Sequence, residues 1–424
     1  MDRYRRNYLA FMGDAVNFGL SMTFASLTTT LPAFIGTLTS SKILVGLFTT
    51  AADGAWLLPQ LFFANLLINK RRKKHFVTLG AVLGRPLMLL YALALVLGLH
   101  RRPVLALVLL FVSQVLFLGT DALAAVAWFD VLGKAIPEER RGRLFGTSQA
   151  ITGVLSIGAG AIIAALLGKK GPPFPLNYAT VFALSGFFLL FSLFSWLFVV
   201  EPEEPVAEER PSWREYFPYL VQTLRSDRTF ARTIVVRLLA GFDLLAVNFY
   251  ILFATSELGL PAATVGIYAA VQTVGSILAG LAFGVIGDRA GCQRVIQIST
   301  ALCLATPLVG LVFFLGGFRG GVLVSVFYGL VFLMIGGVNS SFMLGYTNYG
   351  LELAPAGQRP TYMGLFNTIC GVLMVLPTLG GWLLQTTSYG VLFGLTAAVV
   401  AVSHLLSWRL PALRRPGGAA EPTA

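Results

Sequence analysis

The sequence predicts an all-α membrane protein with twelve transmembrane helices, arranged as two pseudo-symmetric six-helix bundles. Of its 424 residues, 56% are hydrophobic and only 12% are charged, whereas a soluble globular protein carries roughly 25% charged residues. The apolar residues gather in twelve runs, each long enough to cross a bilayer as a helix of about 20 residues. The two halves of the chain also share a sequence pattern, which indicates an internal duplication.

The duplication is clearest in two polar hinges between apolar runs. The first, DVLGKAIPEERRGRLFG, spans residues 130–146, and the second, NYGLELAPAGQRPTYMG, spans residues 348–364. They align without a gap at a separation of 218 positions. The matched pairs are Asp130 and Asn348, Pro137 and Pro355, Arg141 and Arg359, Gly146 and Gly364, and, just upstream, Trp128 and Tyr346. Val45-Gly46 also matches Val265-Gly266. Duplication in a very apolar chain is typical of transporters.

The apolar runs divide the chain into two halves and a linker. Residues 1–200 carry runs at 8–37, 43–68, 76–98, 103–129, 144–168 and 177–200. Residues 232–410 carry runs at 232–257, 262–287, 295–316, 321–350, 361–384 and 389–409. Residues 201–231 form a charge-dense linker between the halves, and residues 411–424 form a tail.

The linker predicts an amphipathic helix. Ser212 followed by Glu215 is a capping-box pattern. The apolar residues that follow at helical spacing are Trp213, Phe217, Leu220 and Leu224. We expect this helix to lie on the inner membrane surface, held by its aromatic residues. A binding site for a regulatory partner is the alternative.

The basic residues predict the orientation in the membrane. Most of the 31 Lys and Arg residues fall on one side, including the run at 70–74 and the six arginines from Arg210 to Arg237. By the positive-inside rule, both termini and the linker are cytoplasmic, and we expect a bacterial cytoplasmic membrane. The turn at 100–103 is the weakest point, because it places two arginines outside. The net charge of +12 is therefore a topology signal, and we expect no binding to nucleic acid.

The segment after the eighth run reads GVIGDRAGCQR, residues 284–294. Together with the hinges and the six-plus-six plan, it resembles the loop motif of the major facilitator superfamily. The matching residues are Gly284, Asp288, Arg289, Gly291 and Arg294. Cys292 and Gln293 replace the usual basic pair, and Asn69 replaces the acid of the corresponding first-half loop. The resemblance implies alternating access, with the first, fourth, seventh and tenth helices lining a central cavity.

The motif and the hinges predict a cytoplasmic gate. Glycine permits a tight turn between two helices, and Asp288 and Arg289 can make charge-assisted bonds that hold the inner face closed until transport breaks them. We expect Asp130 to pair with one of three arginines of its own hinge, at positions 140, 141 or 143. The predicted gate residues are Asp130, Arg140, Arg141, Arg143, Gly284, Asp288, Arg289, Gly291, Arg294 and Arg359.

Ionisable residues within the runs predict the functional site, because a charge at membrane depth is costly. Asp14 shares a helical face with Asn17, and Asp243 is its counterpart in the seventh run. Asp121 shares a face with Trp128. The predicted cavity residues are Asp14, Asn17, Asp121, Trp128, Asp243, Asn339 and Tyr346. A purely structural role, as a helix cap or a helix–helix contact, is the alternative for each of them.

Asp53 and Arg85 both lie near the midplane of adjacent runs, and we expect them to form a structural ion pair. The remaining midmembrane charges are then all acidic. An unpaired carboxylate in a low dielectric favours its protonated form and can exchange a proton near neutral pH. The sequence therefore predicts proton coupling, and an acidic cavity that favours cationic or neutral polar substrates.

The sequence predicts a proton-coupled secondary active transporter of a small molecule, with export of amphiphilic or cationic compounds slightly favoured. Proton-coupled uptake of a sugar-like or other polar nutrient is the alternative. A transport-inactive membrane sensor or scaffold is the rival from another class. We expect no enzyme, cofactor or metal, because His75, His100 and His404 are dispersed, the three cysteines have no metal spacing, and no phosphate-binding loop is found. The expected partners are substrate, protons and lipid, and the expected state is a monomer.

Overall fold

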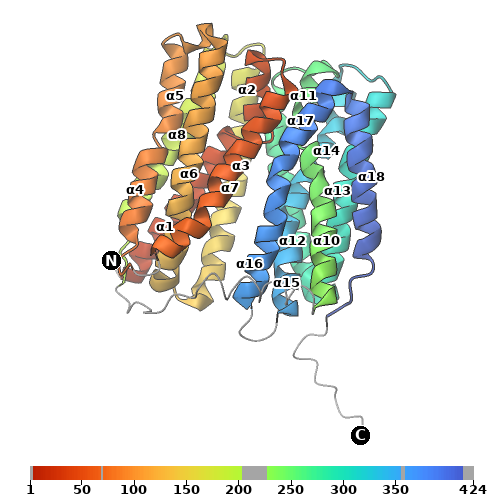
Figure 1. Cartoon of the computed structure of the whole chain (residues 1–424). Coiled ribbons are helices and arrows are strands. Elements are labelled where there is room, and N and C mark those ends of the chain that lie inside the picture. Colours follow the sequence, from red (N-terminus) through yellow and green to blue (C-terminus); the bar gives the residue numbers. More distant parts are fainter. Residues whose placement is uncertain (1–2, 68–69, 203–226, 355–358, 414–424) are drawn as a thin grey trace.

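The structure is a computed structural model that describes residues 3–67, 70–202, 227–354 and 359–413. Figure 1 shows the N-terminal half in warm colours on one side and the C-terminal half in green to blue on the other, with the first described helix beginning and the last one ending toward the lower face. We call this lower face the terminus face and the upper one the opposite face. The predicted linker helix, residues 212–224, and most of the tail lie outside the described residues.

Helices alone make up the regular structure of the described ranges. The N-terminal bundle contains α1 (Arg3–Phe24), α2 (Thr30–Leu38), α3 (Lys42–Leu67), α4 (Lys74–Gly84), α5 (Leu87–Val96), η1 (Leu99–Arg101), α6 (Pro103–Ala135), α7 (Glu138–Leu167) and α8 (Leu176–Leu197). The C-terminal bundle contains α10 (Arg228–Ala240), η2 (Gly241–Leu245), α11 (Phe249–Ser256), α12 (Thr264–Ala290), α13 (Cys292–Leu315), α14 (Val322–Ser341), η3 (Phe342–Thr347), α15 (Asn348–Leu353), α16 (Arg359–Cys370), η4 (Gly371–Val375), α17 (Leu376–Thr386) and α18 (Tyr389–Ser407).

These elements form twelve membrane-length segments, because five pairs of consecutive helices continue one another across a break. Among the described residues, ten segments are long and apolar enough to cross a membrane. The α1–α2 pair and α3 complete the twelve. Many large apolar side chains on the outer surface are exposed, as a lipid-facing surface requires. The predicted fold class is confirmed.

The helix breaks were not visible in the apolar runs. The run predicted at 8–37 is interrupted after Phe24, where the Ser26 hydroxyl accepts hydrogen bonds from the backbone N–H of Thr28 (3.3 Å) and of Thr29 (3.2 Å). Such bonds compete with the helical ladder. The third segment breaks at Arg85 and Pro86, since proline has no N–H to donate. Two of the breaks therefore carry charged residues: Arg85 lies at one and Asp243 lies in η2.

The two bundles share one packing plan, as a duplication requires. In the first half α1 packs on α8 and α3 packs on α6, and in the second half α10 packs on α18 and α12 packs on α14. The contacts between the bundles obey the same symmetry, because α3 meets α17 on one seam and α7 meets α12 on the other. The matched glycines Gly46 and Gly266 lie on these two seams.

At both glycines the seam leaves no room for a side chain. A Cβ atom on Gly46 would lie 1.9 Å from the carbonyl oxygen of Pro377. A Cβ atom on Gly266 would lie 2.2 Å from the backbone nitrogen of Ala164 and 2.3 Å from the carbonyl oxygen of Gly160. The duplicated Val-Gly therefore lets two helix backbones touch across each seam.

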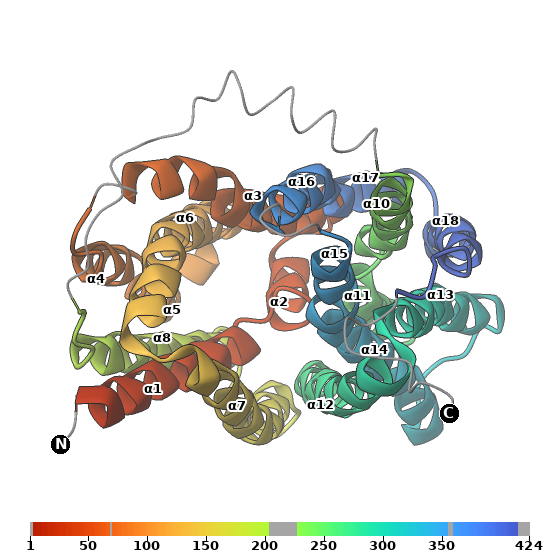
Figure 2. The same ribbon diagram turned by 90° about the horizontal axis from the view of Figure 1, so that it is seen from below.

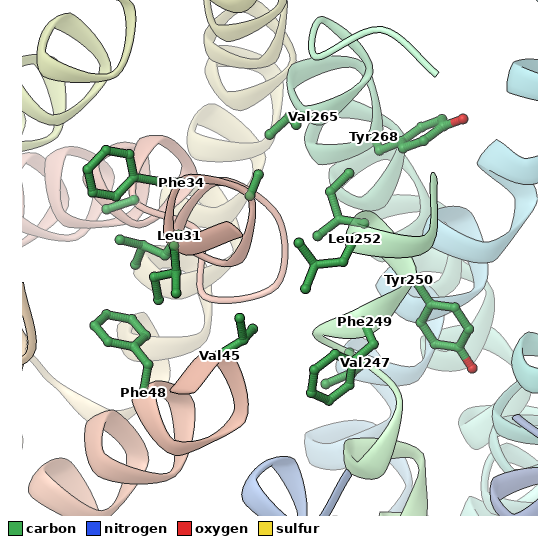
Figure 3. Close-up of a cluster of buried hydrophobic side chains, with 14 of the residues drawn as sticks. Leu31, Phe34, Val45, Phe48, Val247, Phe249, Tyr250, Leu252, Val265 and Tyr268 are labelled. Carbon is green, nitrogen blue, oxygen red and sulfur yellow. The ribbon is translucent and has the colours of Figure 1, made fainter. Parts of the chain in front are cut away.

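The hydrophobic core runs through both bundles in the half near the opposite face and is divided between them in the half near the terminus face. One buried cluster in the half near the opposite face joins both bundles, and Figure 3 shows Phe34, Phe48, Phe249 and Leu252 among its members. In the half near the terminus face, the N-terminal bundle has its own cluster around Phe11, and the C-terminal bundle has another around Phe230, Tyr349 and Phe366. The bundles are thus sealed together in one half only.

Hydrogen bonds between the bundles follow the same division. Asn248 donates to Thr49 at 2.9 Å, and Thr378 donates to Thr50 at 2.7 Å. The remaining cross-bundle bonds, from Thr28 to Gln272 and from Ser41 and Ile43 to Gln385, also lie in the half near the opposite face. Figure 2, seen from the terminus face, shows α2 between the two groups of helices. These five cross-bundle hydrogen bonds therefore all lie in the half near the opposite face.

Candidate functional site

The core of the N-terminal bundle holds a carboxylate at membrane depth. Asp14 is 4% exposed and Arg85 is 3% exposed, and Arg85 donates from Nη1 to Asp14 Oδ1 at 3.1 Å. Trp128 Nε1 donates to Asp14 Oδ2 at 2.8 Å, and the Ser192 hydroxyl donates to Oδ1. Helices α1, α6, α8 and the end of α4 therefore meet at one ion pair whose hydrogen bonds offset the cost of its burial.

This arrangement corrects the prediction that Arg85 pairs with Asp53. The ion pair is real but its acid is Asp14, and Asp53 makes no ion pair in the part of the chain that the structure describes. Asp53 instead lies one turn from Thr49 and Thr50, on the face of α3 that contacts the C-terminal bundle. Depth along the helices allowed Arg85 either partner, and the packing of the bundle places it against Asp14 of α1.

Asp121 lies beside this ion pair. Its carboxylate lies near the side chain of Trp56 on α3, and it is close enough to feel the charges of Arg85 and Asp14. Two carboxylates around one guanidinium leave the group with one negative charge, which a proton or a cation would neutralise. Asp121 and Trp128, which the sequence places on one helical face, both lie next to Asp14. We call Asp14, Arg85 and Asp121 the acidic cluster.

The C-terminal bundle holds a half-buried cation that the sequence did not single out. Arg237, which the sequence groups with the loop arginines, lies nine residues into α10, or about 14 Å along the helix axis. Its guanidinium lies 5.4 Å from the ring centroids of both Phe342 and Tyr346. Both rings belong to the π-helical turn η3. The sequence feature that could have identified Arg237 is its position inside the apolar stretch TIVVRLLAG.

Asp243 lies in η2, one turn and a half beyond Arg237. Its Oδ2 accepts a hydrogen bond from the thiol of Cys303 at 3.9 Å, and its carboxylate lies close to the backbone N–H of Leu244. Asp243 is close enough to Arg237 to feel its charge. No ion pair joins them, however, within the criterion of 4.0 Å.

The two half-sites are related by the duplication. Asp14 corresponds to Asp243, and their neighbours Arg85 and Trp128 correspond, at the hinge separation of 218, to Cys303 and Tyr346. Asp243 contacts Cys303 and is close enough to Tyr346 to influence its hydroxyl electrostatically, so each acid lies near the same two positions in its own bundle. Since Cys303 replaces the arginine, the C-terminal bundle takes its positive charge from Arg237 instead.

Comparison with known proteins identifies the family. The family model described as Major Facilitator Superfamily matches residues 15–376 and 235–423. The chain belongs to this superfamily. No curated protein matches the sequence.

Solved major facilitator transporters share the fold. A D-xylose-proton symporter is 15% identical, with a TM-score of 0.70 over 97% of this chain and 99% of that one. The nucleoside transporter NupG is 14% identical, with a TM-score of 0.65 over 97% and 99%. A bacterial homologue of the iron transporter ferroportin in an inward-facing state is 15% identical, with a TM-score of 0.67 over 97% and 99%. These similarities show the fold, and the superfamily makes the chain a transporter rather than an enzyme.

The superfamily loop motif lies at the terminus face. Asp288 and Arg289 are exposed, and the space around Gly284 is open, with no atom within 4 Å of a Cβ built there. Gly291 adopts a φ of 88°, which only glycine adopts readily, and so turns α12 into α13. Arg294 instead packs within its own bundle, bonded to Gln297 at 2.8 Å and placed over the Trp408 ring. The gate contacts predicted for Asp288 and Arg289 stay a prediction for the other conformation.

The first hinge is held differently from the prediction. Asp130 pairs with Lys134 at 2.6 Å and with Lys73, and not with the arginines of its hinge. Arg141 caps the end of α6, donating to the carbonyl oxygens of Ile136 (3.0 Å) and Gly133 (2.7 Å). The lysines prevail because Lys134 is one helical turn from Asp130. The remaining hinge residues Arg140 and Arg143 are exposed, and Arg359 begins α16.

The other predicted cavity residues are placed as follows. Asn17 donates to the carbonyl oxygen of Gly13 on its own helix at 2.7 Å, so its amide serves α1 itself. Asn339 is exposed, one turn before Phe342. The hydroxyl of Tyr346 is buried and has no hydrogen-bond partner among the described residues. Asn339 and Tyr346 thus flank Phe342 on the tenth segment.

Proposed function

We propose that the protein is a proton-coupled secondary transporter that works by rocking its two bundles against each other, with the terminus face in the cytoplasm. The divided core supports this proposal most directly. The bundles share one apolar cluster near the opposite face and have separate clusters near the terminus face. Under this orientation the structure is an inward-facing state, and closing the terminus face would bring Asp288 and Arg289 into gate contacts.

Coupling to protons is assigned to Asp121 and Asp243. Neither carboxylate is in an ion pair within the described ranges, while Asp14 is neutralised by Arg85. A carboxylate at membrane depth without a counter-ion is stabilised by taking a proton. The acidic cluster therefore exchanges either a proton or the cationic group of a substrate. This competition supports export of cationic or amphiphilic compounds against an inward flow of protons.

The test uses purified protein in liposomes under an imposed pH gradient, with ethidium as the cationic probe and an internal dye that reports pH. We expect ethidium-dependent proton flux in the wild type, and its loss in Asp121→Asn and Asp243→Asn, because an amide cannot exchange the proton. Glu257→Gln, an exposed acid beyond α11, is the matched control and should retain the flux.

Three outcomes would contradict, in turn, the assigned residues, the coupling to protons and the export function. Flux that survives in both variants removes the assignment of coupling to these acids. Ethidium transport without proton movement removes proton coupling altogether. No ethidium movement by the wild type in either direction would favour a transport-inactive sensor over an exporter.

A further inference from the structure

We infer that Arg237 is a binding site for an anionic group, such as a carboxylate, of the transported compound. This inference rests on the proposed function, because it adds a second contact to the same substrate. The acidic cluster of the N-terminal bundle receives a cationic group, and Arg237 receives the anionic one. The preferred substrate is then a zwitterion that bridges the two bundles.

The orientation of the Arg237 side chain supports this role. The rings of Phe342 and Tyr346 lie at equal distances of 5.4 Å from the guanidinium carbon. Aromatic faces attract a guanidinium through cation–π interaction but accept none of its conventional hydrogen bonds. The two rings therefore hold the guanidinium in place while its N–H donors stay available.

The hydrogen-bonding capacity of the site is unused within the described part of the chain. Arg237 Nε is buried without a partner, and the buried hydroxyl of Tyr346 has none either. Tyr346 is 2% exposed. No hydrogen bond or ion pair to the terminal nitrogens is formed there. Arg237 is half-buried, and a buried N–H donor without a partner is costly, so this arrangement favours a ligand that supplies acceptors.

The chemistry of the donors selects the ligand. A guanidinium presents its N–H groups as a planar fork that matches the two oxygens of a carboxylate. Asp243 is near enough to feel the charge but does not pair with it. An external carboxylate can therefore take the place that Asp243 leaves free.

The placement of Arg237 connects the ligand to the conformational change. Its two aromatic neighbours lie in η3, where the tenth segment departs from α-helical geometry. Single π-helical turns often mark functional sites because they reposition side chains within a helix. A ligand on Arg237 thus contacts both the seventh and the tenth segments, which the superfamily resemblance assigns to the cavity lining.

The test measures the thermal unfolding midpoint of the purified protein in the presence of four related probe compounds. Benzoate should raise the unfolding midpoint, and benzamide, which has the same shape without the charge, should not. The zwitterion 4-(aminomethyl)benzoate should act at lower concentration than either benzoate or benzylamine, because it engages both half-sites.

Variants separate this site from general anion effects. Arg237→Gln should weaken the benzoate response by about tenfold or more, the size expected for losing a hydrogen bond to a charged group. Arg237→Lys should retain part of it, since the charge remains without the fork. Arg232→Gln removes an exposed arginine of the same helix and should change nothing.

The inference is wrong if benzoate and benzamide act equally on the wild type, if neither acts at millimolar concentration, or if Arg237→Gln responds as the wild type does. These results would leave the proton-flux assay of Asp121 and Asp243 unaffected. Conversely, a benzoate response that depends on Arg237 would stand even if transport proved to be independent of protons.

Discussion

Replacing Asp14 by alanine should lower the free energy of unfolding by about 3–5 kcal/mol, the typical cost of leaving a buried charge without its partner. Arg85 is 3% exposed, and its ion pair with Asp14 at 3.1 Å is the most buried one in the described chain. The variant also removes the acceptor of the Trp128 and Ser192 hydrogen bonds. Thermal unfolding in detergent is the measurement.

The double variant Asp14→Ala with Arg85→Leu tests the cause. If the loss comes from an unpaired guanidinium, removing both charges should recover much of the stability, because an apolar pair of similar volume is often as stable as a buried ion pair. Asn17→Ala, on the same helix, removes only a bond to its own backbone and should be nearly neutral. A double variant no more stable than Asp14→Ala would show that Arg85 is not the source of the loss.

The second large effect is expected at the α7–α12 seam. Gly266→Ala should shift the conformational equilibrium away from the present state by about 1–3 kcal/mol, or roughly 5- to 150-fold in population. The added methyl would lie 2.2 Å from the Ala164 nitrogen and 2.3 Å from the Gly160 oxygen, and backbone atoms cannot rotate aside. Distances between spin labels on the two bundles report the populations.

Gly158→Ala is the matched control for this change. Gly158 lies on α7, and a Cβ built there has no atom within 4 Å. Both substitutions bring the same gain in helix propensity, so their difference isolates the steric effect. Equal populations in the two variants would mean that the seam yields to the added methyl, and that close backbone contact does not hold this conformation.

The fold was predictable because it rests on one-dimensional properties of the sequence. The length of the apolar runs and their low charge predicted the twelve segments. The gap-free alignment of the two hinges predicted the duplication. The structure adds a physical meaning to that alignment: Trp128 and Tyr346 adjoin equivalent acids, and the matched glycines Gly46 and Gly266 occupy equivalent seams. These features follow from patterns within single segments and their repetition.

The partners of the charged residues were less predictable, because pairing depends on helix rotation and on breaks. Arg85 stood at a similar depth to both Asp14 and Asp53, and only the three-dimensional packing decides between them. Asp130 had three arginines and a lysine within reach along the chain, while Lys73 came from a distant loop. Arg237 escaped notice because it lies close enough to the segment end to be read as a loop residue.

The most direct test of the whole account measures two inter-bundle distances in the same protein. One pair of spin labels, at Gly146→Cys and Gly284→Cys, reports the terminus face on α7 and α12. The other, at the exposed residues Lys169→Cys and Ala262→Cys, reports the opposite face. Adding substrate or lowering the pH should shorten the first distance in the same fraction of molecules in which it lengthens the second. Two distances that never change together under any such condition would contradict transport by rocking of the bundles.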